Sequence, residues 1–211
     1  MVTTNLVAIA GGTCAGKTTL AGILSECLTG GVSVLSQDNY YPDRSGWSNR
    51  EMAQFNWDSL ESFDVARIKA ALHDLMSSRP VSVPHYDKVT HAVDRERTKI
   101  IVPASVLIFE GLHAIELAMR SLDNFRAHTI ILTAVFIDCE ARERRRRRTE
   151  QELLNKAVPG DFAKYWQERC EPTFLAQISP QRSLANLVIN SPWSNDAITD
   201  LLARLTCPSN T

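Results

Sequence analysis

One glycine-rich segment near the amino terminus constrains this chain more than any other feature. It fits the pattern G-x-x-x-x-G-K-[ST] with the residues Gly11-Gly12-Thr13-Cys14-Ala15-Gly16-Lys17-Thr18. An apolar run at 6–10 precedes it, and residues 17–28 continue it with apolar side chains at helical spacing. A strand that enters a helix through such a turn is typical of a loop whose backbone N–H groups and new helix N-terminus bind phosphate. We therefore expect a nucleotide to bind here.

The loop also predicts individual contacts with that nucleotide. Lys17 is expected to reach the β- and γ-phosphates of ATP, and the Thr18 hydroxyl to bind the accompanying Mg²⁺. A GTPase would need a guanine-binding [NT]KxD segment, but the pair Asn155-Lys156 continues with alanine and valine. The nucleotide-binding residues predicted from the loop are Gly11, Gly12, Thr13, Cys14, Ala15, Gly16, Lys17, Thr18 and Thr19.

Composition limits the partners of the chain. Its 211 residues favour one domain, 1–211, with a modest insertion. The net charge of −1 provides no surface-wide field for nucleic acid or anionic lipid. The apolar run at 6–10 is too short for a signal peptide or a membrane span, and the five scattered cysteines form no CxxC pair. We expect a cytoplasmic protein with free thiols and with neither membrane nor nucleic acid as a partner.

Apolar runs and helical patterns alternate along the sequence, which predicts an α/β fold with a parallel sheet and helices on both of its faces. Strands buried on both sides are expected at 6–10, 32–35, 106–109, 130–137 and 187–189. Helices are expected at 17–28, 65–76, 141–154 and 162–176. Residues 80–102 break the alternation with a period of two, and we expect a β-hairpin inserted there.

Two acidic residues follow predicted strands. Asp38 comes after the second strand, which we place beside the strand of the phosphate loop, so its carboxylate is expected to enter the cleft. There it can accept the proton of an attacking hydroxyl, although it could also be the N-cap of a following helix. Glu110 ends the third strand, in the position of a carboxylate that holds Mg²⁺ directly or through water.

Several further motifs occur together with the phosphate loop, in an order and spacing that resemble the uridine kinase family. They are Gln37-Asp38-Asn39-Tyr40-Tyr41, Asn56-Trp57-Asp58, Tyr86-Asp87-Lys88-Val89-Thr90-His91 and Phe109-Glu110-Gly111. The resemblance covers about residues 5–190 and extends to phosphoribulokinases, pantothenate kinases and nicotinamide riboside kinases. It implies a P-loop fold with a hairpin for the substrate and a helical lid at about 142–162. It also implies transfer of the γ-phosphoryl group of ATP, with Mg²⁺, to the 5′-hydroxyl of a nucleoside.

The resemblance also assigns roles to residues of the acceptor site. Asp38 resembles the general base, Asp58 the residue that holds the ribose hydroxyls, and Tyr86 and His91 the residues that contact a pyrimidine. Tyr40 is included among the substrate contacts. From the residues alone, Tyr86 could equally belong to the hairpin core, and a lone histidine is more often structural.

The chain departs from the family in ways that leave the acceptor base open. Uridine kinases usually carry phenylalanine where this chain has Lys88, and arginine where it has Val93. The stretch from Trp57 to Glu61 is similar to nicotinamide riboside kinases. Uridine or cytidine is therefore the first expectation, with nicotinamide riboside or another small alcohol as the alternative. A nucleotide-binding regulatory module without catalysis is the rival from a different class, and both a monomer and a homo-oligomer are consistent with the sequence.

Six arginines lie within residues 142–148. Nucleic-acid binding is disfavoured because no aromatic residues are interleaved and the surroundings are acidic. Arg144, Arg147 and Arg148 share one helical face, which we expect to clamp phosphates, while the other arginines are solvated or paired with Glu140, Glu143 and Glu150. By position in the lid, Arg144 and Arg148 are the candidates for catalysis, and Arg148 also for contact with the substrate.

Overall fold

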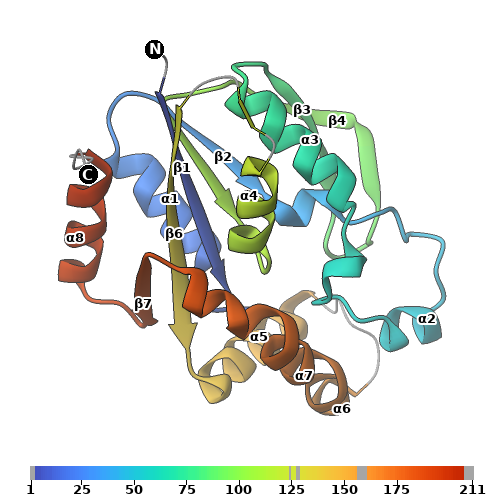
Figure 1. The fold of residues 1–211 in the computed structure, drawn as a ribbon. Helices are drawn as coiled ribbons and strands as arrows, with labels where there is room; N and C mark the ends of the chain where they lie inside the picture. The colour runs from blue at the N-terminus through green and yellow to red at the C-terminus, as the bar shows by residue number, and fades with distance from the viewer. Residues whose placement is uncertain (1–2, 124, 127–128, 156–160, 207–211) are drawn as a thin grey trace.

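The computed structural model describes residues 3–123, 125–126, 129–155 and 161–206 (Figure 1). Five parallel strands form the central sheet in the order β2-β5-β1-β6-β7. They are β1 (Thr3–Gly11), β2 (Val32–Ser36), β5 (Val106–Glu110), β6 (Thr129–Cys139) and β7 (Leu187–Ser191). The predicted strands and the α/β class are confirmed. Two details of the prediction were wrong. Strand β2 does not lie beside β1, because β5 separates them. The edge strands β2 and β7 are only partly buried, not buried on both faces.

Side chains of β1 alternate between two apolar layers, as the period of a strand requires. Leu6, Ala8 and Ala10 face the layer of α3 (Val65–Met76) and α4 (Ala114–Leu122). Val7 and Ile9 face the layer of α1 (Lys17–Cys27) and α8 (Asn195–Thr206). Both layers are visible on the two sides of the sheet in Figure 1. This double cover fixes the sheet as a rigid platform for the residues at its carboxyl edge.

Three helices were not expected from the alternation of strands and helices, namely α2 (Asn49–Gln54), α4 and α8. The short helix α2 begins with a capping box in which Ser48 and Glu51 bond reciprocally to each other's backbone N–H groups. The expected helix at 65–76 is confirmed as α3, and the Asp64 side chain caps it by accepting from the Arg67 N–H.

The predicted hairpin is also present. Strands β3 (Val81–Tyr86) and β4 (Val93–Ile101) pair antiparallel, apart from the main sheet. The turn between them carries Lys88 toward the end of β2.

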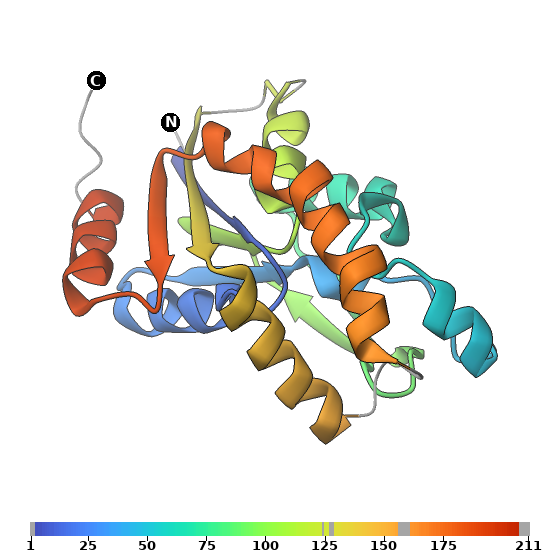
Figure 2. The same cartoon turned by 90° about the horizontal axis from the view of Figure 1, so that it is seen from below.

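Two long helical segments lie below the carboxyl ends of the strands, and Figure 2 shows them from that side. The first is α5 (Ala141–Asn155), which carries the arginine run. The second is a continuous segment composed of α6 (Phe162–Tyr165), a π-helical turn (Trp166–Cys170), α7 (Glu171–Thr173), another π-helical turn (Phe174–Ile178) and a 3-10 turn (Ser179–Leu184). The lid predicted at about 142–162 begins in α5, and its residues 156–160 lie outside the described part of the chain. None of the described helices is long and apolar enough to cross a lipid bilayer.

Candidate active site

A cleft of about 570 Å³ opens at the carboxyl edge of the sheet. Its walls come from the loop after β1, the end of β2, the hairpin turn, the end of β5 and the inner face of α5, a position typical of ligand sites in parallel α/β folds. The structure brings most of the predicted site residues together in this cleft: Thr13, Cys14, Gly16, Lys17, Thr18, Thr19, Asp38, Asp58, Tyr86, His91, Glu110 and Arg148.

The loop between β1 and α1 forms the floor of the cleft. Lys17 donates to the carbonyl oxygen of Gly12 over 2.8 Å, and burial lowers its pKa while Glu110 and Asp38 oppose that shift. Gly16 caps α1 with φ of 107°, in the left-handed region that favours glycine. A Cβ at Gly16 would lie 2.7 Å from the Trp193 ring, which covers the loop there. The predicted residues Gly11, Gly12 and Ala15 supply backbone to the loop but do not line the cleft.

Arg144 does not line the cleft, contrary to its predicted role as a phosphate clamp. Its side chain is 1% exposed, donates to the Cys139 carbonyl and forms an ion pair with Glu171. It passes directly behind Gly12, where a Cβ would lie only 2.7 Å from the Arg144 Cδ. Because Arg144 lies in the first turn of α5, it points into the junction of the helix and the sheet, not toward the ligand. We therefore correct its assignment to a structural one.

The next turn of α5 reaches the cleft in its place. Arg147 donates to the Cys14 carbonyl over 3.2 Å, and Arg148 donates to the Thr13 hydroxyl over 3.3 Å. Arg148 also pairs with Glu152 over 2.8 Å. Of the three arginines expected on the inner face of α5, Arg147 and Arg148 therefore line the cleft and Arg144 does not.

Asp38 lies in the 3-10 turn that follows β2 and forms an ion pair with Lys88 of the hairpin turn, with 2.6 Å between Oδ2 and Nζ. Burial raises the pKa of Asp38, but the Lys88 ammonium and then Lys17 outweigh burial, so that the pKa lies below its usual value. The carboxylate is therefore ionised at neutral pH. Its backbone N–H lies 3.4 Å from the Ser36 hydroxyl, so Ser36 is the N-cap of this turn and Asp38 is not.

Tyr40 does not lie in the cleft, and its predicted contact with substrate is corrected. Residues 37–40 form a 3-10 turn, in which residues three apart share a face. Tyr41 therefore lies on the same side as Asp38 and lines the cleft, whereas Tyr40 is buried in the core. The Tyr41 hydroxyl donates to the Trp57 carbonyl over 2.7 Å.

Asp58 lies deep in the cleft and is only 4% exposed. Burial raises its pKa, and Arg148 and Lys17 reduce this effect. The Cys170 thiol, on the first π-helical turn, hydrogen-bonds to its carboxylate. This buried carboxylate needs polar partners, and vicinal hydroxyl groups of a ligand would supply them.

Aromatic side chains form the remaining wall of the part of the cleft that contains Asp38 and Asp58, which we call the acceptor half. The Tyr86 hydroxyl lies 2.8 Å from His91 Nδ1, and the His91 ring stacks on Trp57 with 4.2 Å between ring centroids. Tyr86 also packs on Tyr41 at 5.0 Å. Both Tyr86 and His91 are largely buried in the hairpin, and both line the cleft.

Glu110 and Thr18 line the cleft near Asp38 and fit the predicted Mg²⁺ site. Burial raises the pKa of Glu110, the neighbouring carboxylate of Asp38 raises it further, and the Ser36 hydroxyl donates to Oε1 over 2.5 Å. A cation would relieve the repulsion between the two carboxylates, and hydroxyl and carboxylate oxygens suit Mg²⁺. In the described part of the chain, no group of three or more His, Cys, Asp or Glu side chains could hold a metal ion alone. The ion would depend on phosphate oxygens for the rest of its coordination.

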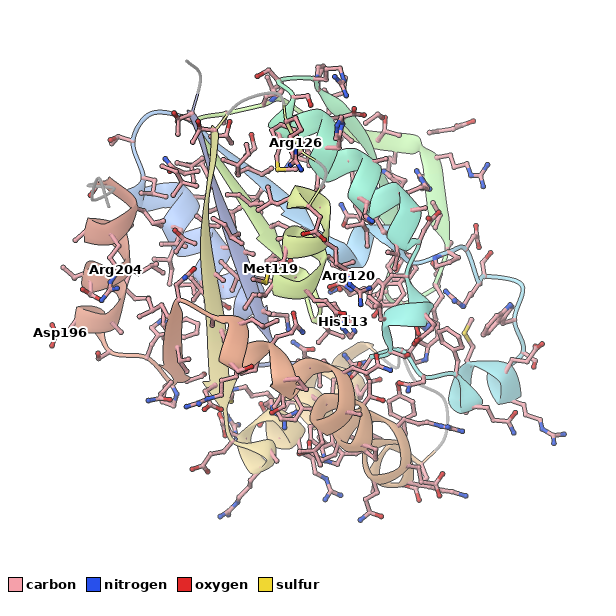
Figure 3. All side chains as sticks on the ribbon, in the orientation of Figure 1. His113, Met119, Arg120, Arg126, Asp196 and Arg204 are labelled. Carbon is pink, nitrogen blue, oxygen red and sulfur yellow. The ribbon has the colours of Figure 1, made fainter. Side chains whose placement is uncertain are left out.

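His113 lies at the start of α4 (Figure 3). It is fully buried, and its Nε2 lies 2.9 Å from the Asp58 carbonyl. Burial lowers its pKa to about 4, so the ring is neutral at pH 7. His113 therefore contacts the backbone of Asp58 and helps to position it.

Comparison with known proteins agrees with this geometry. The model of the Phosphoribulokinase / Uridine kinase family matches residues 6–197. The uridine kinase of Mycoplasma pneumoniae is 32% identical over 194 residues, which cover 90% of this chain and 85% of that protein. The uridine kinase of Deinococcus deserti is 29% identical over 201 residues, covering 94% and 93%.

Solved structures share the fold at lower sequence identity. A possible uridine kinase from Bacillus stearothermophilus superposes with a TM-score of 0.58 at 18% identity and covers 89% of each chain. Phosphoribulokinase from Rhodobacter spheroides gives a TM-score of 0.65 at 10% identity, covering 89% of this chain and 70% of that one. At these identities the likeness concerns the fold alone.

Proposed function

The chain belongs to the phosphoribulokinase/uridine kinase family, and on this basis we propose that it is an ATP-dependent kinase that phosphorylates the 5′-hydroxyl of a ribonucleoside, with uridine and cytidine preferred. The main observation that supports this proposal is that three groups meet in one cleft. They are the phosphate loop with Lys17, the Asp38 carboxylate and the buried Asp58 carboxylate. A module that only bound nucleotide would need the first group alone. The complete set favours catalysis.

At the donor end, the N–H groups of the loop and Lys17 bind the phosphates of ATP. Arg147 and Arg148 of α5 reach the same loop from the opposite side, and arginine binds phosphate oxygens with a planar set of donors. We propose that α5 forms the N-terminal part of the lid at about 142–162. The lid excludes water, so that ATP is not hydrolysed.

Mg²⁺ bound by the Thr18 hydroxyl, the Glu110 carboxylate and phosphate oxygens would neutralise negative charge on the transferring group.

At the acceptor end, Asp58 accepts hydrogen bonds from the ribose hydroxyls and so directs the 5′-hydroxyl toward Asp38. Lys88 binds Oδ2 of Asp38, and Oδ1 accepts the proton of the attacking hydroxyl. The hydroxyl oxygen bonds to the γ-phosphorus, the bond from that phosphorus to the bridging oxygen breaks, and ADP leaves. Most of the rate enhancement then comes from positioning and charge stabilisation, as is general for phosphoryl transfer.

We also propose a cytoplasmic location and no nucleic-acid partner. The four cysteines in the described part of the chain, Cys14, Cys27, Cys139 and Cys170, are free thiols, as expected in a reducing compartment. The outer arginine Arg146 pairs with Glu143 and Glu150, which reduces the charge that this face of α5 could present to a polyanion.

The test is a measurement of ADP release with uridine, cytidine and 2′-deoxyuridine at one fixed Mg-ATP concentration. We expect turnover of both ribonucleosides and at least roughly tenfold lower kcat/KM for the deoxy compound, because Asp58 then lacks a buried partner. Equal rates with and without the 2′-hydroxyl would remove Asp58 from its role. No release above the ATP-only background with any nucleoside would overturn the proposed function.

A further inference from the structure

Lys88 lies inside the acceptor half of the cleft, not on the outer side of the hairpin. Its Nζ is held 2.6 Å from Asp38 Oδ2, across 50 residues of sequence. Its side chain is 64% exposed, so the ammonium remains accessible to a ligand that enters beside the base. The ammonium is therefore fixed next to the position of the attacked hydroxyl, where the Asp38 carboxylate offsets part of its charge.

A second cation lies behind the aromatic wall of the same half. Arg44 is 7% exposed, and its guanidinium lies 4.0 Å from the ring centroid of Phe55 and 5.6 Å from that of Trp57. Its hydrogen bonds run to the carbonyl oxygens of Pro42 and Ser62. Among the described residues, no carboxylate forms an ion pair with it. The charge of Arg44 is therefore balanced by aromatic faces and carbonyl dipoles only.

The carboxylates of the cleft are already engaged. Asp38 pairs with Lys88, Glu152 with Arg148 and Glu150 with Arg146. Glu110 accepts from the Ser36 hydroxyl, and Asp58 is buried against the Cys170 thiol with Arg148 nearby. A positively charged ring beside Trp57 would lie near two cations, and each described carboxylate that lines the cleft already has a donor or a cation beside it.

We propose that Lys88, backed by the buried Arg44, is a specificity-determining residue that makes the acceptor half select against substrates whose ring carries a positive charge. This inference rests on the proposed function, because it concerns the acceptor of the same site. Neutral rings and rings with an anionic substituent are accepted, whereas a pyridinium ring without an anionic substituent is penalised. Two like charges roughly 7 Å apart in a partly hydrated cleft reduce affinity by about tenfold.

Two ribosides with the same sugar and the same pyridinium ring provide a matched test. Nicotinamide riboside carries a net positive charge, and nicotinic acid riboside adds a carboxylate that neutralises it. Binding of each, with uridine as reference, is measured by calorimetry in the presence of a non-hydrolysable ATP analogue. Wild type should bind the carboxylate compound about tenfold more tightly than the amide.

Variants of Lys88 assign this difference to its charge. Lys88→Met should reduce the difference at least about threefold, whereas Lys88→Arg should retain it. Lys99→Met removes an exposed lysine from the same hairpin, on β4, and should behave as wild type. High salt should weaken the discrimination of the wild type, because the cleft is open to solvent.

The outcomes separate this inference from the proposed function. Equal affinities in the wild type, an unchanged difference in Lys88→Met, or no binding of either riboside would overturn the role of Lys88. A charge preference without turnover of any nucleoside would support Lys88 and overturn the kinase proposal. Turnover of uridine without a charge preference would overturn the inference alone.

Discussion

The Arg144 guanidinium lies 2.9 Å from the Glu171 carboxylate, so that a buried cation on α5 meets a quarter-exposed anion on α7. The same guanidinium lies 3.7 Å from the ring centroid of Phe174 and passes behind Gly12 of the phosphate loop. One ion pair therefore joins the root of the proposed lid, the loop that binds ATP and the helix beside Asp58.

We expect Glu171→Gln to lower the free energy of unfolding by about 2 kcal/mol, because it leaves the Arg144 charge buried without a counterion. Urea denaturation monitored by circular dichroism measures this loss. Glu150→Gln breaks an exposed pair with Arg146 and should cost less than about 1 kcal/mol. Equal losses in both variants would show that the buried pair contributes no more to the free energy of unfolding than the exposed pair does.

Lys17→Ala should remove most of the stabilisation by ATP while the fold is retained. Saturating Mg-ATP raises the unfolding temperature of the wild type because it binds only the native state. The variant should show a much smaller rise in a thermal-shift titration, and the exposed Lys69→Ala on α3 should match the wild type. An equal rise in Lys17→Ala would place the nucleotide elsewhere.

Asp38→Asn should lower turnover while ATP binding stays close to that of the wild type. Loss of a positioned base typically costs about 10²- to 10⁴-fold, and the lower end is expected where positioning and charge dominate. Steady-state kinetics with uridine provides the measurement, and Asp74→Asn, a surface change on α3, is the control. Turnover like that of the wild type would exclude Asp38 as the base.

His113 should make the fold sensitive to acid. Its pKa is lowered from 6.5 to about 4 by burial, so the unfolded chain takes up its proton first as the pH falls. The contribution of the neutral ring is complete above about pH 6.5 and is lost progressively down to about pH 4, by up to about 3 kcal/mol. Urea titrations at pH 7 and pH 4.5 should therefore differ less for His113→Gln than for the wild type. The exposed His85→Gln should leave the difference intact, and an unchanged difference in His113→Gln would contradict the assignment.

The features that sequence predicted correctly are those with local signals. The phosphate loop, the helix at 65–76 and the hairpin at 80–102 each carry their own period, cap or turn residues, and the structure has all three. Helix α8 was not expected, although apolar residues at 198, 201, 202 and 205 mark it locally. The order of the strands has no such local signal, because nothing near β2 in the sequence indicates that β5 will lie between β2 and β1.

The features that sequence could not predict depend on contacts between distant segments. Arg144 and Arg148 share a helical face, and only the packing of α5 against the phosphate loop and α7 buries one and leaves the other in the cleft. Lys88 was visible as a departure from the uridine kinase pattern, but its contact with Asp38 depends on the fold of the hairpin over the sheet. Tyr41 could have been found, since the three-residue spacing from Asp38 suits a 3-10 turn.

The close passage of Arg144 behind Gly12 limits which substitutions at these two positions can be accepted during evolution. A side chain at position 12 would collide with an arginine that the surrounding core holds in place, so either residue limits what the other can become. Substitutions at 12 should be tolerated only after position 144 has become smaller, which imposes an order on the mutational steps. A loop transplanted from another protein would similarly need a matching residue in the first turn of the lid helix.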